Sequence, residues 1–377
     1  MNSMERLRAA RPAHLDTPTD PGTRTRELDH AFSQHRQTAS RRSFRPVWGL
    51  GLAGAVTAAA VVASGVLFDP QAEVSTDPVV APTASVALDA RTVLLSAATQ
   101  AEAQQEKTGT WWSSTSVQRH MSRVQGEPSY AVYELSETEA WTPYAPGGEQ
   151  ISRSQRRGFE FPSPEDEAAW KQAGSPSKVS VGAPKPVKAG SAEQASYPID
   201  REPGKERVSR SRLVDGDKVF WLGKNVTMKE LQELPGDPKR LKAWLLRSYK
   251  GHDTESSSVP MTSEAWLYRV TTGLIADMPV TPKVRGAAFR MLAELKTVQV
   301  VENVTDFEGR SGTAVTMKEK ASGAVLLNRL VFDRATGRAL QTDSVIVEPG
   351  GYQRTLPAGA LWNAVTIVSS GWTEEAP

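Results

Sequence analysis

The chain has 377 residues, no cysteine and a formal net charge of +2 at neutral pH. The absence of cysteine excludes disulfide bonds, thiolate chemistry and cysteine-ligated zinc. Beyond residue 69, basic and acidic residues number 36 and 37, so this part lacks the concentrated positive charge that binding to nucleic acid requires. We expect one large or two small domains beyond this point and no nucleic-acid partner.

Residues 1–45 are predicted to form a short cytoplasmic tail. They contain nine arginines against five acidic residues, and Pro12, Pro18 and Pro21 separate two short segments with helical character. Two interpretations stay open: a solvated tail without a partner, and a docking peptide for a cytosolic protein.

A single transmembrane helix is predicted for residues 46–68. Val47 to Phe68 is a run of 22 residues without a charge, and three arginines stand shortly before it. As a helix rising about 1.5 Å per residue, this run is about 33 Å long and spans a hydrocarbon core of about 30 Å. Because basic flanks stay in the cytoplasm, we expect a single-pass protein of the cell membrane whose C-terminal part is extracytoplasmic.

Two other interpretations of this run are open. Ser40 to Phe44 resembles a twin-arginine export motif, which implies a signal that is cleaved after export. A buried helix of a soluble domain is the second. No small-residue cleavage site directly follows the run, and the nearest one, Ser85 to Ala87, lies well beyond it. We therefore favour an uncleaved anchor.

Gly49 to Gly54 has the G-x-G-x-x-G spacing of dinucleotide-binding loops. That motif binds a pyrophosphate only where a strand ends and a helix begins. No strand pattern precedes these glycines, so we interpret them as small residues of the membrane helix and expect no cofactor.

The residues beyond the membrane helix are predicted to form a linker, 69–86, and an extracytoplasmic α+β domain, 87–377. The linker is rich in Pro, Ala, Ser and Thr. Apolar residues at three- and four-residue steps then predict a helix, and alternating patterns predict strands. The first elements are a helix over Leu88–Glu106 and strands over Thr110–Arg119, Ser129–Thr142 and Gln150–Phe161.

The middle of the domain begins with a short acidic helix headed by Ser163. Residues 173–205 are rich in Pro and Gly and are predicted to form a long exposed loop, either functional or disordered. Strand character returns over Arg207–Leu222, where Asp215-Gly216 predicts a hairpin turn.

Four helices are predicted next from N-cap residues and first-turn prolines. The first is capped by Thr227, the second begins at Asp237-Pro238, the third at Thr262 and the fourth at Thr281-Pro282. Six of their side chains lie at core spacing: Trp244, Leu245, Trp266, Leu267, Phe289 and Leu292.

The last eighty residues predict a meander of five strands. Together with the earlier elements this indicates a curved antiparallel sheet with a packed helical block. The five strands cover Val298–Thr305, Ser311–Glu319, Val325–Asp333, Arg338–Glu348 and Ala360–Trp372.

The outer segments resemble a family of uncharacterised single-pass actinobacterial membrane proteins associated with extracytoplasmic sigma-factor systems. The resemblance implies a place beside such signalling systems and assigns no chemistry to any residue. It is carried by Leu94–Ala101 with Gly109–Trp112, Leu234–Leu245, Pro279–Leu292, Val300–Val315 and Phe332–Arg338.

The turn at 333–337, between two alternating strands, is also similar to turns in the half-open barrels of lipoprotein carriers and envelope-stress sensors. That likeness implies a concave sheet able to hold a lipid acyl chain or an unfolded peptide as ligand.

We expect no catalytic, cofactor-binding or metal-ligating residues in the outer domain. Its only histidines, His120 and His252, stand in no recognisable catalytic setting. Paired carboxylates, such as Glu137 with Glu139 and Asp215 with Asp217, are interpreted as solvated charges. Trp111 and Trp112 point to opposite faces of a strand, so we expect one in the core and one exposed.

These observations predict a non-enzymatic sensor or accessory regulatory protein of the cell envelope. An outer ligand or partner would alter what the tail presents inside. The alternative is a carrier of a lipid or lipoprotein, and a hydrolase acting on the cell wall is a third interpretation.

Overall fold

The structure, a computed structural model, describes residues 89–377 except 106, 183–195, 222–223, 255–258 and 322. The predicted tail, transmembrane helix and linker lie outside the described residues and remain predictions. Within the described part, no helix combines the length and the apolar character that crossing a membrane requires.

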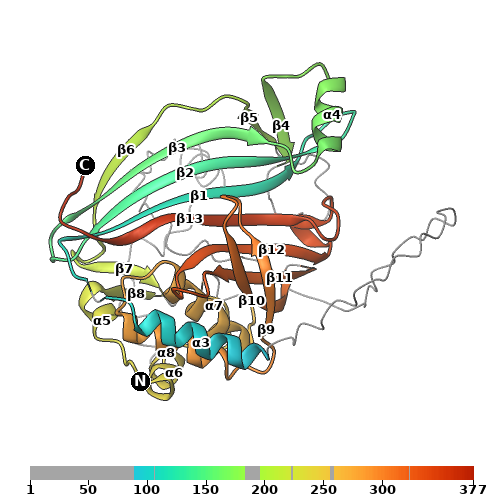
Figure 1. The fold of residues 1–377 in the computed structure, drawn as a ribbon. Coiled ribbons are helices and arrows are strands. Elements are labelled where there is room, and N and C mark those ends of the chain that lie inside the picture. The colour runs from blue at the N-terminus through green and yellow to red at the C-terminus, as the bar shows by residue number, and fades with distance from the viewer. Residues whose placement is uncertain (1–88, 106, 183–195, 222–223, 255–258, 322) are drawn as a thin grey trace, which may run out of the picture. The chain divides into compact units, whose positions relative to one another are not determined.

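A nine-stranded antiparallel sheet dominates the described part, which confirms the predicted α+β class (Figure 1). The strand order is β6-β3-β2-β1-β13-β12-β11-β10-β9. The five-strand meander of the sequence prediction is present as β9 to β13. The strands are β1 (Trp111–Arg123), β2 (Ala131–Pro143), β3 (Glu149–Glu160), β6 (Arg207–Arg212), β9 (Gln299–Thr305), β10 (Ser311–Ala321), β11 (Ala324–Phe332), β12 (Ala339–Glu348) and β13 (Leu361–Thr373).

Strands β1 and β13 join the two halves of the sheet. Trp111 pairs with Thr373 and Trp112 with Trp372, and the ladder continues to His120 with a bulge between Thr115 and Ser116. The pairing brings together residues about 260 positions apart, which no local pattern in the sequence can indicate. As a consequence, Trp112 and Trp372 lie side by side on the sheet.

Two predictions for the middle of the chain are wrong in part. The segment 173–205 contains a hairpin of β4 (Lys178–Gly182) and β5 (Ser196–Asp200), whereas residues 183–195 are outside the described part. Asp215-Gly216 does form a turn, with φ of 52° and 88°. Its flanking strands do not pair, however, because β6 joins β3 and β7 (Lys218–Trp221) pairs with β8 (Lys224–Thr227).

The described residues form six α-helices, all of them predicted from the sequence. Thr227, Asp237, Thr262 and Thr281 are N-caps whose side chains accept a backbone N–H three residues later, as expected for such caps. The helices are α3 (Ala90–Glu102), α4 (Pro164–Gln172), α5 (Met228–Gln232), α6 (Pro238–Leu246), α7 (Ser263–Ala276) and α8 (Pro282–Leu292); a 3-10 turn covers Gly351–Gln353.

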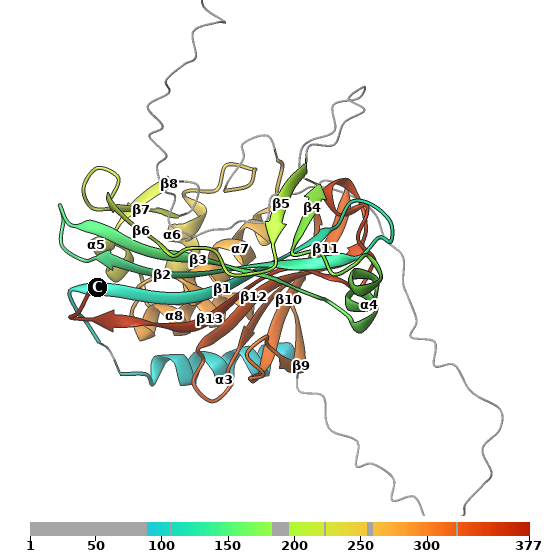
Figure 2. The same cartoon turned by 90° about the horizontal axis from the view of Figure 1, so that it is seen from above.

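The largest core lies between the helices and the sheet, and Figures 1 and 2 show α7 and α8 beside the curved strands. Phe289 of α8 meets Phe332 of β11 edge to face, with ring centroids 5.1 Å apart. The Tyr268 hydroxyl donates toward the carbonyls of Val315 and Asn328, each at 2.9 Å. The helices therefore occupy the sheet face that the half-barrel likeness had offered for an acyl chain.

Five of the six predicted core side chains are fully buried, and Trp244 is partly buried against the same core. Trp112 is buried, whereas Trp111 is half-buried rather than fully exposed. The expected division between the two faces of β1 is therefore confirmed for Trp112.

Candidate functional site

A pocket of about 520 Å³ lies where the end of α3, the start of α8 and the strands β1, β12 and β13 meet. Figure 1 shows the connection from α3 to β1 and the end of β13 on the same side of the domain. We call this the indole–arginine pocket. It is lined by Gln104, Gln105, Lys107, Trp112, Ile275, Ala276, Val280, Pro282, Arg285, Arg338, Ala339, Ser370, Gly371 and Trp372.

One wall of the pocket is aromatic and well fixed. The rings of Trp112 and Trp372 meet edge to face, with centroids 5.5 Å apart and planes at 73°. The Trp112 Nε1–H donates to the carbonyl of Asp277 at 3.1 Å, and the ring of Tyr144 meets that of Trp372 edge to face, with centroids 5.8 Å apart. Such pairing holds the indole rings in defined orientations and leaves Trp372, which is only partly buried, available for contact.

The lining also carries positive charge. Arg285 lies near the start of α8 and Arg338 follows the turn between β11 and β12, whereas Lys107 lies in the segment after α3. No lining residue among those described is Asp or Glu. Within the described lining, the cations therefore have no carboxylate to neutralise them.

Arg285 is the least compensated of these cations. Its guanidinium forms no hydrogen bond or ion pair with any described residue, and Arg338 donates only one long bond, to the Ser370 carbonyl at 3.3 Å. Burial, together with the neighbouring charge of Arg338, lowers the pKa of Arg285 to about 10. The side chain is still charged at neutral pH, at a cost in free energy that an anion in the pocket would offset.

A titratable carboxyl lies behind the aromatic wall. Asp277 caps the C-terminus of α7, and burial raises the pKa of its side chain to about 7. Its backbone carbonyl anchors Trp112. The residue that anchors Trp112 therefore also carries a titratable carboxyl group, although this side chain does not line the pocket.

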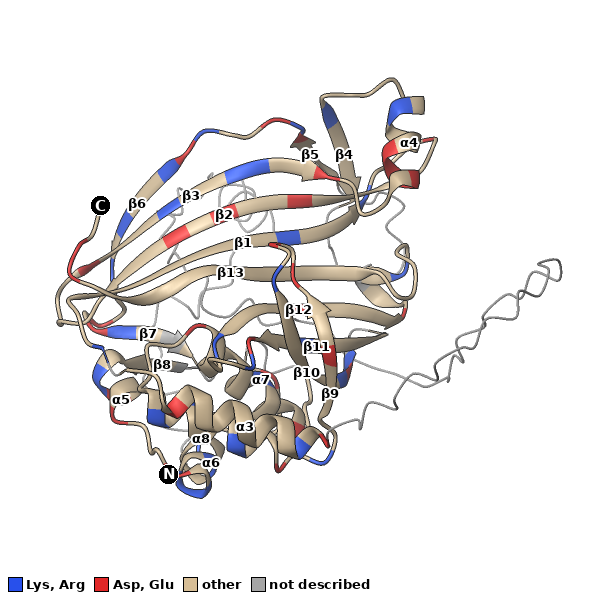
Figure 3. Ribbon diagram, in the orientation of Figure 1, with Lys and Arg blue, Asp and Glu red and all other residues tan. Residues whose placement is uncertain are grey.

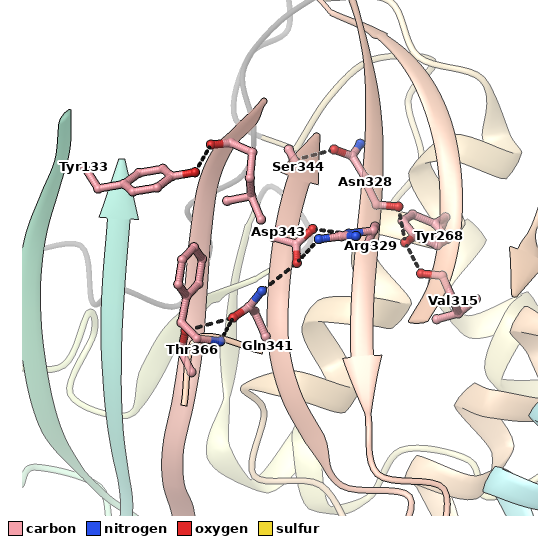
Figure 4. Close-up of polar contacts among 11 residues, drawn as sticks. Tyr133, Tyr268, Val315, Asn328, Arg329, Gln341, Asp343, Ser344 and Thr366 are labelled. Atoms are coloured by element: carbon pink, nitrogen blue, oxygen red, sulfur yellow. Dashed lines mark hydrogen bonds and ion pairs between the residues drawn. The ribbon is translucent and has the colours of Figure 1, made fainter. Parts of the chain in front are cut away.

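Elsewhere, buried charges belong to closed networks. Figure 4 shows the carboxylate of Asp343 between Arg329, at 2.5 and 3.0 Å, and Gln341, at 2.7 Å. Arg269 of α7 binds Asp253 at 2.7 Å and Glu319 at 2.8 Å. Burial raises the pKa of Asp343 and of Glu319, and the arginines counteract this shift.

These two carboxylates do not converge on a cleft. Asp343 pairs in register with Arg329, and the adjacent Ser344 pairs with Asn328, so these two pairs point to opposite faces of the sheet. Asn328 is the residue that donates to Glu319, at 2.7 Å. The Arg269 network holds α7 to the sheet and the Asp343 network links β11 to β12. Neither offers a pair of carboxyl groups to a substrate.

The charges on the outer strands are also paired. Figure 3 shows acidic residues on β2 beside basic residues on β3, with further basic residues on β6 at the edge of the sheet. Arg153 binds Glu139 at 2.7 Å and Arg157 binds Glu137 at 3.1 Å. Glu137 and Glu139, interpreted as solvated charges, are therefore cross-strand partners of arginines. Asp215 is exposed and pairs locally with Lys218.

The two histidines of the domain lie apart from the pocket lining. His120 stacks edge to face on Trp362 at 5.5 Å, and burial lowers the pKa of its ring. The Nδ1 atom of His252 lies 2.8 Å from the carbonyl of Asp253. No group of three or more metal-ligating side chains occurs among the residues that the structure describes.

No motif in the sequence marks Arg285 or Arg338 as a binding residue. One local signal points to Arg285: α8 carries Lys283 and Arg285 near its N-terminus and no acidic residue in its first turn, although the helix dipole disfavours cations there. The other lining residues come from four segments far apart in the sequence, so only the fold brings them together.

Comparisons with known proteins identify no family. No protein-family model matches the chain, and no curated protein matches it. Among solved structures, an outer membrane lipoprotein-sorting protein domain from Vibrio parahaemolyticus aligns with 75% of this chain and 93% of its own, at 8% identity and a TM-score of 0.15. A likeness at this score carries no argument about fold or function.

Proposed function

We propose that the chain is a membrane-anchored, non-enzymatic sensor or accessory regulatory protein of the cell envelope, whose outer domain binds a small ligand. The indole–arginine pocket is the observation that carries this proposal. It combines a fixed aromatic wall with cations, and its described lining residues include no carboxylate. The tail, residues 1–45, would then present the signal to a cytosolic partner, in keeping with the resemblance to proteins of sigma-factor systems.

A binding role has more support than a catalytic one. Acid–base hydrolysis of a cell-wall polymer needs two carboxyl groups that face one substrate. The buried carboxyl groups of Glu319 and Asp343 each have an arginine partner, and neither lines the pocket. The pocket offers charge and apolar surface, which suit recognition.

The alternative, a carrier of a lipid or lipoprotein, has less support. A carrier needs a deep apolar cavity for acyl chains. In this domain α7 and α8 fill the sheet face next to β10 to β12 with packed side chains. The pocket, by contrast, lies at the end of α3, and three of its lining side chains are cationic.

Deletion of residues 2–40 in the native host separates the sensor from the carrier. A sensor that signals through its tail should lose its effect, so the transcript profile of the deletion strain should match that of a strain lacking the whole protein. A carrier works outside the membrane and should tolerate the loss. A wild-type profile, with the truncated protein present at normal levels in the membrane, would contradict the proposed function.

A further inference from the structure

We infer that the indole–arginine pocket binds a small organic anion: its charged oxygens, as in a carboxylate or a phosphate monoester, lie between Arg285 and Arg338, and a flat or apolar body lies against Trp112 and Trp372. The inference rests on the proposed function, because it names the class of ligand that the outer domain would sense.

The positive charges of Arg285 and Arg338 indicate that the ligand is negatively charged. Arg285 is partly buried without a hydrogen-bonding partner among the described residues, and Arg338 is near enough to disfavour its charge. Guanidinium groups bind carboxylates and phosphates through forked pairs of N–H groups. An anion between Arg285 and Arg338 would accept hydrogen bonds from both guanidinium groups and offset the repulsion between their charges. A cation at the same place would increase that repulsion.

The N-terminus of α8 adds to the positive potential. Pro282, the first residue of this 11-residue helix, lines the pocket, and the aligned peptide dipoles place partial positive charge at a helix N-terminus. Lys107 supplies a third cation at the exposed edge. No described lining side chain carries the opposite charge, so the charged side chains of the lining favour an anion. The C-terminus of α7, at Ile275 and Ala276, adds only partial negative charge.

The apolar lining of the pocket indicates which kind of group forms the uncharged body of the ligand. Trp112 is 5% exposed and fixed by its bond to Asp277, and Ile275, Ala276 and Val280 continue the apolar surface. Offset or edge contacts with indole rings favour flat groups. A cavity of about 520 Å³ falls within the range of about 300–1,000 Å³ that drug-sized ligands occupy.

The probe for the test is 1-naphthyl phosphate, which carries both features. Its binding is measured by isothermal titration calorimetry on the full chain in lipid nanodiscs, with empty nanodiscs subtracted. Inorganic phosphate has the charge without the body, and 1-naphthyl glucoside has the body without the charge. We expect saturable binding of naphthyl phosphate, with both single-feature compounds at least ten-fold weaker.

Three variants assign the binding to the pocket. Arg285→Gln and Arg338→Gln should each weaken the affinity about ten-fold or more, since a hydrogen bond to a charged group is lost. Arg91→Gln is the matched control, because Arg91 is an exposed arginine on α3 outside the pocket lining. Its affinity should equal that of the wild type.

Folding is checked by the thermal unfolding midpoint. Arg285→Gln removes an uncompensated charge, so we expect an unchanged or higher midpoint together with the loss of binding; a merely structural arginine would lower it. Equal affinity for the glucoside and the phosphate, an equal effect of Arg91→Gln, or no binding by the folded wild type would overturn the inference. The tail-deletion experiment does not depend on these outcomes, so failure of the inference is distinguishable from failure of the proposed function.

Discussion

Two groups of arginines in this domain differ in their surroundings. Arg269 and Arg329 lie in the core and bind carboxylates at 2.5 to 2.8 Å. Arg285 and Arg338 line a pocket in which no described lining residue carries a carboxylate. Arg269 fixes α7 to β10 and Arg329 links β11 to β12, whereas burial and the nearby charge of Arg338 disfavour the charge of Arg285. This difference separates residues that serve the fold from residues that we assign to ligand binding.

The largest effect is expected where a paired arginine is removed. Arg269→Met leaves the buried carboxylates of Asp253 and Glu319 without the guanidinium that they share. We expect a loss of about 3–5 kcal/mol in the free energy of unfolding, since a buried charge without its partner is strongly unfavourable. Urea unfolding followed by tryptophan fluorescence measures it.

Arg334→Met is the matched control for this comparison. Arg334 binds Glu302 at 2.6 Å, but both side chains are about 40% exposed. Exposed ion pairs contribute about 0–1 kcal/mol. If the two variants lost equal stability, the distinction between buried networks and surface pairs would be wrong.

A second prediction concerns the contact between α3 and α8, the two helices whose ends border the pocket. A Cβ at Gly286 would lie 2.8 Å from the Ala98 carbonyl oxygen and would collide with the Glu102 side chain. Gly286→Ala should therefore cost about 1–2 kcal/mol by overpacking. Gly273→Ala in α7, where a Cβ meets nothing within 4 Å, should instead be neutral or stabilising by up to about 1 kcal/mol.

Chemical denaturation of both glycine variants checks this prediction. The sign of the two effects matters more than their size, because both substitutions raise helix propensity equally. A stabilised Gly286→Ala variant would show that α3 and α8 are not in the close contact described.

The third prediction concerns pH. The pKa of Asp277 is near 3.8 in the unfolded chain and about 7 in the folded domain. Below pH 4 both states hold the proton. Between pH 4 and 7 only the folded state keeps it, so this group lowers stability as the pH rises, and the loss is complete above 7. Asp277→Asn should remove that loss.

The expected gain for Asp277→Asn at pH 8 is about 1–2 kcal/mol, because the side chain retains partial access to water. At about pH 3, below the pKa of both states, the variant and the wild type should be equally stable. Unfolding measured at both pH values in the two proteins isolates this carboxyl, since all other groups are shared. A gain that is independent of pH would contradict the assigned pKa.

The smallest effect on stability is expected at Arg285. Arg285→Gln should raise the free energy of unfolding by about 0.5 kcal/mol, because an uncompensated charge near Arg338 is removed. The same unfolding assay measures it, with Arg91→Gln as the neutral control. A loss of 1 kcal/mol or more would place Arg285 with the structural arginines.

The sequence predicted the elements better than their arrangement. Thr262 and Thr281 are N-cap residues that predict the start of a helix. The alternation of apolar and polar residues, together with the turn residues, predicts the meander from β9 to β13. The pairing of β4 with β5 is not predicted, because each strand has only five residues and the surrounding sequence is rich in proline, which is typical of a loop. The pairing of β1 with β13 depends on distant segments.

The candidate site could not be predicted for the same reason. Trp112, Arg285, Arg338 and Trp372 come from four separate segments, and each has an ordinary local setting. Only Lys283 and Arg285 depart from a local preference, because the helix dipole disfavours cations near the N-terminus of α8. A departure from local preference is the kind of signal that marks a functional position.

Native mass spectrometry of the full chain, released gently from the native envelope, tests the central claim most directly. We predict a reproducible extra mass that belongs to an organic anion. The mass should be absent from the variant that combines Arg285→Gln with Arg338→Gln and present in Arg91→Gln. A wild-type protein that is repeatedly free of ligand, or a double variant that retains the mass, would contradict the account.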